Sequence, residues 1–162
     1  MKNWLVLIIL FGLTSCGFHL KGTSAFDAPM PYHSWKIDGG SMQRALEVAL
    51  RRQPDIVVDA EKPEVVIKVI SATQNSSTSA IDLSGGTSEY MLSLNVSVQA
   101  YRYDKPLGDP IQVTVNRYMD YSDHEVLAKE DEQRMIWRDM RTDAAEQIVR
   151  RLAFLPVMTT DE

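Results

Sequence analysis

One thiol is the most reactive group in this sequence, because Cys16 is the only cysteine among the 162 residues. It stands in the string LTSCG (13–17), directly after an apolar run at 4–13 that Lys2 precedes. A positive charge, an apolar stretch and small residues at a cleavage point together form a secretory signal. The apolar run covers roughly half the length that crossing a bilayer requires. We therefore expect residues 1–15 to be a signal peptide that is removed.

The residues before the thiol, Leu-Thr-Ser-Cys, resemble the bacterial lipobox, whose cysteine is acylated and becomes the new N-terminus. The resemblance implies a covalent lipid on Cys16 and no other cofactor. Acyl chains contribute about 0.8 kcal/mol of membrane affinity per buried methylene, so two or more form a stable anchor. In lipoproteins of this type an aspartate after the cysteine implies the inner membrane, and Gly17 here implies the outer membrane. The alternative is an ordinary signal peptide followed by a free or buried cysteine.

The other side chains that could act as catalytic groups or metal ligands are not arranged for catalysis. His19, His33 and His124 lack metal-ligand spacing, so we expect no metal site. There is no glycine-rich phosphate loop after a strand, no nucleophile elbow and no recognisable catalytic pair. Four carboxylates near the last predicted helix are interpreted as helix-start and solvated charges, Glu125, Glu130, Asp131 and Glu132. The sequence therefore does not predict an enzyme.

Composition predicts one acidic domain on a lipid anchor. Removing residues 1–15 leaves 147 residues, enough for one core, and the loss of Lys2 takes the net charge from −5 to −6. Such a chain is a poor nucleic-acid binder, since that activity depends on clustered Lys and Arg. Residues 16–31 contain glycines, prolines and small polar residues and predict the lipidated cysteine with a tether. Residues 32–162 are expected to form a single domain.

The first half of that domain predicts a strand and a helix. Residues 32–37 alternate between apolar and polar side chains, as a half-buried strand does. Ser41 is a favourable helix cap, apolar residues follow at helical spacing, and Pro54 should stop the helix after Gln53.

Three further strands are expected. Residues 65–70 are strongly apolar and continue into a polar run at 71–79 that predicts a long hairpin arm projecting from the core. Residues 90–100 alternate most clearly and predict a strand with one buried and one wet face, the wet face including Met91 and Gln99. The remaining segments are a turn at 84–86, a turn at 105–110 and a last strand at 111–116.

A long final helix should cover the sheet. Residues 122–125 (SDHE) have the spacing of a capping box, and the helix should end before Pro156. Its predicted apolar stripe is Ile136, Trp137, Met140, Ala144, Ala145, Ile148, Val149 and Leu152. The order β-α-β-β-β-α predicts an α+β fold, a two-layer sandwich in which two helices pack on one face of a four-stranded mixed sheet.

Several strings resemble one family, the lipopolysaccharide-assembly lipoproteins LptE. The string CGFHLK (16–21) is similar to the start of the mature family proteins, SEY (88–90) to their third strand, and LAKEDEQ (127–133) with DAAEQIVRRL (143–152) to their final block. The resemblance implies the same two-layer fold. It also implies an outer-membrane lipoprotein that stands inside the lumen of the LptD β-barrel as a plug, assists assembly of that barrel and contacts lipopolysaccharide.

The resemblance also implies where lipopolysaccharide would be contacted. Its anionic groups need cations, and Lys129 matches a family position implicated in that contact. Alternatively, Lys129 pairs with Glu125 or Asp131 on the surface. The resemblance also implies that a basic residue in the loop at 81–87 can contact lipopolysaccharide, but this loop has none. Arg117 could compensate for that missing cation. Two other functions stay open, a lipid-anchored adaptor that scaffolds another envelope machine without binding lipid, and a periplasmic hydrolase.

Overall fold

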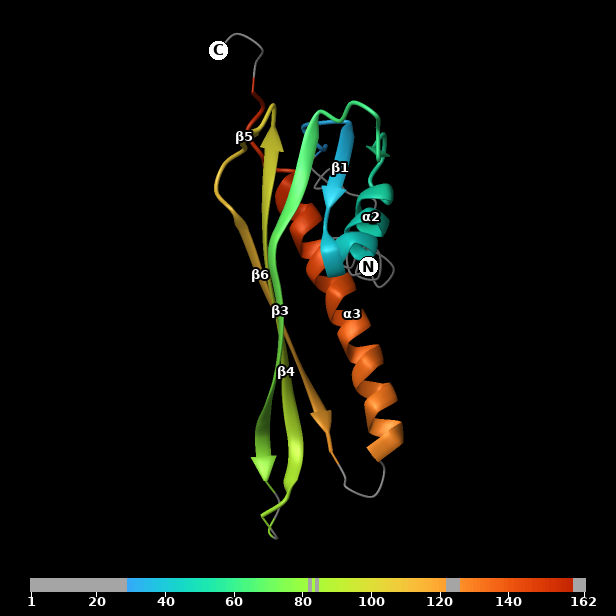
Figure 1. Cartoon of the computed structure of the whole chain (residues 1–162), viewed down its shortest axis with the longest axis vertical. Helices are drawn as coiled ribbons and strands as arrows, with labels where there is room; N and C mark the ends of the chain where they lie inside the picture. The colour runs from blue at the N-terminus through green and yellow to red at the C-terminus, as the bar shows by residue number, and fades with distance from the viewer. Residues whose placement is uncertain (1–28, 82, 84, 122–125, 159–162) are drawn as a thin grey trace, which may run out of the picture.

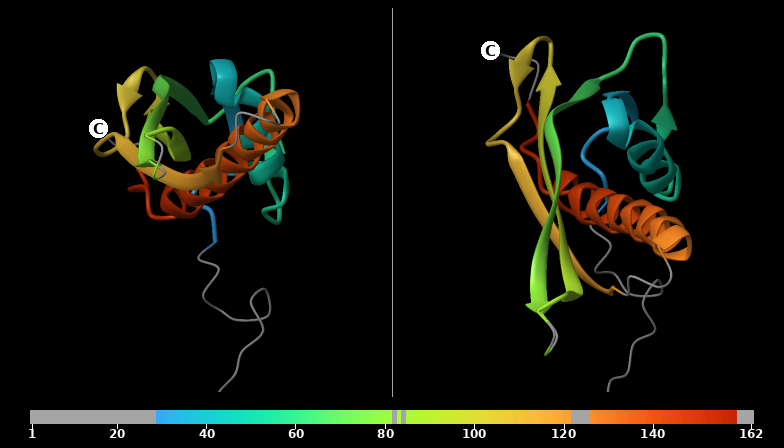
Figure 2. Two further views of the ribbon diagram at one scale, coloured as in Figure 1. Left: turned by 90° about the horizontal axis from the view of Figure 1, so that it is seen from below. Right: turned by 60° about the horizontal axis from the view of Figure 1, so that its bottom comes forward.

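Two layers make up the protein, a long twisted sheet and a pair of helices that lie together on one side of it (Figures 1 and 2). This computed structural model describes residues 29–81, 83, 85–121 and 126–158. The elements in chain order are β1 Ser34–Asp38, the 3-10 helix η1 Gly40–Met42, α2 Gln43–Arg51, β2 Val57–Val58, β3 Val65–Ile81, β4 Thr87–Arg102, β5 Lys105–Pro106, β6 Ile111–Asp120 and α3 Val126–Leu152.

The predicted α+β class and the mixed sheet with two helices are confirmed, but the sheet has six strands rather than four. The two extra strands, β2 and β5, contain two residues each. β2 adds to the outer edge of β1 in parallel. β5 pairs with Tyr101 and Arg102 of β4. β3 pairs along one edge of β4, so both β5 and β6 lie on the opposite edge. The chain therefore turns at Tyr103 and Asp104, both at positive φ, earlier than predicted.

The long strands pair as the sequence predicts. β1 runs parallel to β3, with Trp35 opposite Val65, and β3, β4 and β6 form an antiparallel meander. β6 extends to Asp120, beyond the predicted end at 116, and stays paired with β4 as far as Glu89. The polar run of β3 continues as a strand to Ile81 and pairs with β4, so the predicted arm is confirmed. In Figure 1 this arm forms the lower end of the molecule.

The first helix begins later and ends earlier than predicted. Ser41 caps no helix, because Gly40 at a φ of +50° turns the chain into η1 and α2 starts only at Gln43. The Gln43 side chain instead accepts the backbone N–H of Gly39 at 2.8 Å. α2 ends at Arg51, before the predicted Gln53. α3 ends before Pro156 as expected, and the predicted capping box at 122–125 lies outside the described residues.

The buried hydrophobic side chains form one cluster between the sheet and the helices. β4 buries every even-numbered residue from Leu92 to Ala100, as its alternation predicts. In α3 the buried residues are Met140, Ala144, Ala145, Ile148, Val149 and Leu152. The predicted members Ile136 and Trp137 are partly buried at its margin. Apolar burial of this kind is the main favourable term in the folding free energy.

One predicted wet-face residue is buried. Gln99 is 5% exposed, because the segment between β5 and β6 folds over it. Its amide Nε2 donates to the carbonyl oxygens of Ala100 at 3.0 Å and Gly108 at 3.1 Å. A buried amide is tolerated when its hydrogen bonds are made, and here the Gln99 amide bonds backbone carbonyls on both sides of the turn through β5.

The end of the described chain returns to its beginning. The Tyr32 hydroxyl donates to the Pro156 carbonyl at 2.8 Å and accepts the Met158 N–H at 3.0 Å. Arg102 lies 5.0 Å from the Tyr32 ring centre, and its Nη1 donates to the Met158 carbonyl at 2.7 Å. We call Tyr32, Arg102, Pro156 and Met158 the terminal clasp. The predicted signal peptide, Cys16 and most of the tether lie outside the described residues.

Candidate functional site

A pocket opens where the arm of the sheet faces the first turns of α3. It has a volume of about 310 Å³, and we call it the distal pocket. Its lining residues are Ser76, Tyr90, Met119, Tyr121, Lys129, Glu130 and Gln133. They come from β3, β4, the end of β6 and α3, so the pocket exists only once the sheet and the helix have docked.

Lys129, predicted from the sequence, supplies a cation to this pocket. Its side chain is 16% exposed, and Nζ lies 2.8 Å from Glu132 Oε2. Among the described residues Lys129 thus pairs with Glu132, three residues further along α3, and Asp131 pairs with Arg134. Glu125, the other predicted partner, lies outside the described residues. The carboxylate of Glu132 is 44% exposed, so water weakens its attraction for Lys129.

An aromatic and apolar wall stands beside this cation. The rings of Tyr90 and Tyr121 meet edge to face, with centroids 5.1 Å apart, and Met119 is 4% exposed. Tyr121 is fixed by its N–H, which donates to the Ser88 carbonyl at 2.9 Å. Apolar surface next to a largely shielded ammonium suits a ligand that carries an anionic group close to an apolar part.

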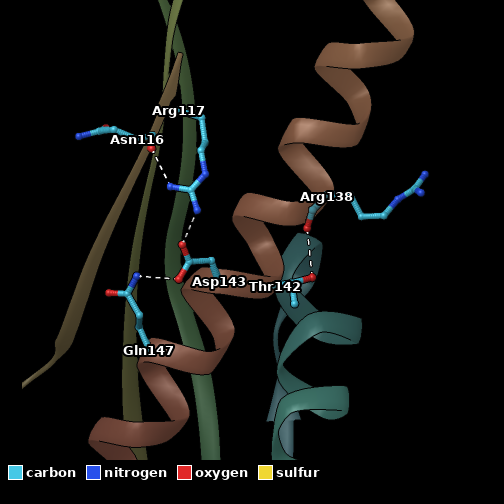
Figure 3. Close-up of polar contacts among 6 residues, drawn as sticks. All are labelled: Asn116, Arg117, Arg138, Thr142, Asp143 and Gln147. Atoms are coloured by element: carbon cyan, nitrogen blue, oxygen red, sulfur yellow. Dashed lines mark hydrogen bonds and ion pairs between the residues drawn. The ribbon is translucent and has the colours of Figure 1, made fainter. Parts of the chain in front are cut away.

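Arg117, the second predicted contact, lies elsewhere on the sheet. Its Nη2 lies 2.9 Å from Asp143 Oδ2 of α3, and its Nη1 donates to the Asn116 carbonyl at 3.0 Å (Figure 3). Asp143 also accepts from Gln147 Nε2 at 3.0 Å. Asp143 and Lys129 are separated by about 20 Å of helix axis at 1.5 Å per residue. The structure therefore does not bring Arg117 and Lys129 into one site, and Arg117 joins β6 to α3.

Two exposed apolar side chains lie at the tip of the arm. Ile81 is 68% exposed and Leu83 is fully exposed, and residues 82 and 84 lie outside the described chain. Tyr90, Met119 and Tyr121 were not singled out as site residues from the sequence. The alternation at 90–100 indicates only a core face for Tyr90, and Met119 and Tyr121 lie beyond the predicted strand at 111–116. Tyr90 and Tyr121 lie at the same end of the β4–β6 pairing, where Glu89 is opposite Asp120.

The described residues hold no group of three or more His, Cys, Asp and Glu side chains suited to a metal ion. His33 is exposed, while His19 and His124 are outside the described ranges. Among the helices of the described chain, none combines the length and hydropathy needed to span a membrane.

Comparison with solved structures places this fold among bacterial lipoproteins. The solution structure of an uncharacterised lipoprotein B from Nitrosomonas europaea superposes with a TM-score of 0.68 at 24% identity, covering 85% of this chain and 90% of that one. A minor lipoprotein from Acinetobacter baumannii gives 0.67 at 20% identity, covering 81% and 99%. At these identities the likeness defines a class by fold alone, a small two-layer α+β domain.

The sequence comparisons narrow this class to one family. A family model described as "LptE: Lipopolysaccharide-assembly" matches residues 30–152, so the chain belongs to the LptE family. The LPS-assembly lipoprotein LptE of Pectobacterium atrosepticum is 32% identical over 143 residues, which cover 85% of this chain and 76% of the relative. The protein of that name from Yersinia enterocolitica is 31% identical over 160 residues, covering 91% and 75%. The resemblance predicted from the sequence is thereby confirmed.

Proposed function

We propose that this protein is an outer-membrane lipoprotein that plugs the LptD β-barrel, assists its assembly and contacts lipopolysaccharide during delivery to the cell surface. The proposal is supported by membership of a family whose role is lipopolysaccharide assembly. In it, acyl chains on Cys16 hold the protein at the inner face of the outer membrane. The role is that of a non-enzymatic partner, in which the domain supplies surfaces rather than a reaction.

The plug role is supported by the sheet face that points away from the helices. On β4 and β6 it presents paired polar side chains, with Ser93 Oγ 2.6 Å from Asn116 Oδ1 and Thr114 Oγ1 donating to Asn95 Oδ1 at 2.7 Å. The interiors of large outer-membrane barrels are polar. A hydroxyl and amide surface can exchange its water for hydrogen bonds to such an interior at little cost.

The lipid contact rests on one observation, the shielded ammonium of Lys129 beside the aromatic wall of the distal pocket. Lipopolysaccharide carries phosphates and carboxylates close to its acyl chains, which matches a cation next to apolar surface. Arg117 is the second proposed contact. Its guanidinium has five N–H donors, of which the bonds to Asp143 and Asn116 use only some.

Both parts of the proposal can be tested in one purification. The tagged, acylated protein is isolated from its native envelope in mild detergent, its protein partners are identified by mass, and the retained lipopolysaccharide is measured. Lys129→Asp and Lys129→Gln are compared with Lys62→Asp, which makes the same charge change in the exposed loop before β3. An Asp near the start of α3 is favourable to the helix dipole, so we expect both Lys129 variants to fold.

We expect the wild type and Lys62→Asp to retain a stoichiometric barrel protein together with lipopolysaccharide. Both Lys129 variants should retain the barrel and lose about tenfold or more of the lipid affinity, the size expected for a lost charge-assisted hydrogen bond. Wild-type lipid retention by Lys129→Asp would remove Lys129 from the site. Recovery of the barrel without lipid from every protein, the wild type included, would refute the lipid contact. Recovery of other envelope partners without the barrel would refute the plug role and favour the lipid-free adaptor.

A further inference from the structure

A second groove, lined by arginines, lies between α2 and α3. Its volume is about 560 Å³, and Arg44 and Arg52 line it from the α2 side while Arg138 and Arg141 line it from α3. Arg44 and Arg52 are eight residues apart and Arg138 and Arg141 are three apart, and residues at these spacings share one face of a helix. The two arginines on each side therefore line the same groove. We call this the arginine groove. It shares no lining residue with the distal pocket.

The charge in this groove is mostly uncompensated. Arg52 Nη1 lies 2.8 Å from Glu146 Oε1, but within the described part of the chain Arg44, Arg138 and Arg141 form no ion pair. Asp139 and Asp143 each lie two residues from Arg141 on α3. Asp143 is held by Arg117 and Gln147, and Figure 3 shows Arg138 extending away from it. A guanidinium is always protonated in proteins, so these residues repel one another in a chain whose net charge is −5.

We propose that the arginine groove binds a phosphate monoester. Several guanidiniums that face one space offer more N–H donors than the two oxygens of a carboxylate can accept. A phosphate monoester matches them better, because it has three terminal oxygens and close to two negative charges. Ser41 and Thr142 line the same groove. The Ser41 hydroxyl adds a neutral donor, whereas the Thr142 hydroxyl donates to the Arg138 carbonyl at 3.2 Å. Arginine's planar fork matches phosphate geometry, which a lysine cluster would not.

The volume of the groove and its apolar lining residues indicate that the phosphate is part of a larger molecule. The space exceeds what an inorganic phosphate occupies, and Ala45, Val48 and Ala49 form an apolar part of its lining. Val48 is 44% exposed, an apolar surface that such a molecule would cover. A phosphorylated lipid headgroup and a soluble phosphomonoester share this chemistry, so the test has to separate them.

Three probes are added to the acylated, detergent-solubilised protein: inorganic phosphate, the short-chain lipid dihexanoyl phosphatidic acid, and dihexanoyl phosphatidylcholine. Binding is followed by titration calorimetry and by the thermal midpoint at constant ionic strength. The groove variant is Arg44→Gln with Arg141→Gln. Its matched control is Arg51→Gln with Arg150→Gln, which removes the same charge from the same helices outside the groove.

We expect phosphatidic acid to bind the wild type and the control, and phosphatidylcholine to bind neither. The groove variant should lose about tenfold or more of the affinity, while its thermal midpoint without ligand stays equal or rises because like charges are removed. A comparable response to inorganic phosphate identifies the phosphate alone as the ligand, and a response to phosphatidic acid alone identifies a lipid headgroup. Absence of binding, or equal loss in variant and control, overturns the proposal.

This proposal stands apart from the lipopolysaccharide contact. Lys129→Asp should leave phosphate binding in the groove unchanged, since Lys129 does not line it. Loss of binding in Lys129→Asp with retention in the groove variant would place the phosphate in the distal pocket and refute the groove.

Discussion

At the scale of single residues, Glu64 shows how a carboxylate can fasten a strand without a salt bridge. Its Oε2 accepts the backbone N–H of Ser34 at 3.0 Å and of His33 at 2.7 Å, at the point where β1 begins. These two hydrogen bonds, with smaller contributions from the charges of His33 and Arg102, lower the pKa of Glu64 below its usual value. Hydrogen bonds to the ionised form stabilise it, so the folded state prefers the charged carboxylate.

This lowered pKa predicts a pH-dependent contribution to stability. Because the folded pKa lies below the unfolded one, the contribution is fully present above the unfolded value of about 4.3 and is lost as pH falls through the folded value. Glu64→Gln should therefore be less stable than the wild type at pH 7, and the difference should shrink toward pH 2. Urea unfolding of both proteins across this range measures it. A difference that stays constant with pH would mean that ionisation of Glu64 is irrelevant to folding.

The site residues differ in how far sequence could define them. Lys129 was predicted through its neighbours in the final block, and it does line the distal pocket. Its ion-pair partner Glu132 was not predicted, because the choice among nearby acids depends on side-chain rotamers. The alternation of β6 places Arg117 on the sheet face that the helices cover. Its pairing with Asp143 could not be predicted, because it depends on how α3 crosses the sheet.

At the scale of elements, α3 carries much of the core on one face. Met140 is completely buried, whereas Met135, little more than one turn earlier, is 57% exposed. Met140→Ala should lower the free energy of unfolding by about 2–5 kcal/mol, since the change removes contacts and leaves a cavity.

Met135→Ala is the matched control on the same helix, and we expect a change within about 0.5 kcal/mol. Chemical denaturation of both variants checks the pair. Equal effects would show that α3 does not dock on the sheet through the face described here.

Local pattern predicted the long elements and missed their ends. The alternation of β4 and the apolar stripe of α3 are repeated over many residues, so a single exception does not hide them. The exceptions arise from distant contacts. Gln99 is buried because the segment between β5 and β6, including Gly108, folds over it. Ser41 fails as a cap because Gly40 redirects the chain. The strands β2 and β5 are too short to leave a periodic signal.

At the scale of the whole molecule, the terminal clasp joins the start of β1 to the segment after α3. Tyr32→Phe removes the hydroxyl that bonds both Pro156 and Met158, and should lower the free energy of unfolding by about 1 kcal/mol. Removal of residues 156–162 should cost a similar amount or more, because Arg102 also loses its bond to Met158.

A double-mutant cycle distinguishes the clasp from two unrelated effects. In the shortened chain Tyr32→Phe should have almost no effect, because its partners are already gone. Additive losses would contradict the clasp. Thermal or urea unfolding of the four proteins is sufficient.

The unequal lengths of β1 and β3 leave one backbone edge open. β1 pairs with β3 only as far as Lys68, so within the described chain the outer edge of β3 from Val69 to Ile81 has no neighbouring strand. Such an edge is a template for any extended chain. This one has three shifts of register against β4 but neither lysine nor proline to block addition. Self-association through this edge should therefore increase with protein concentration.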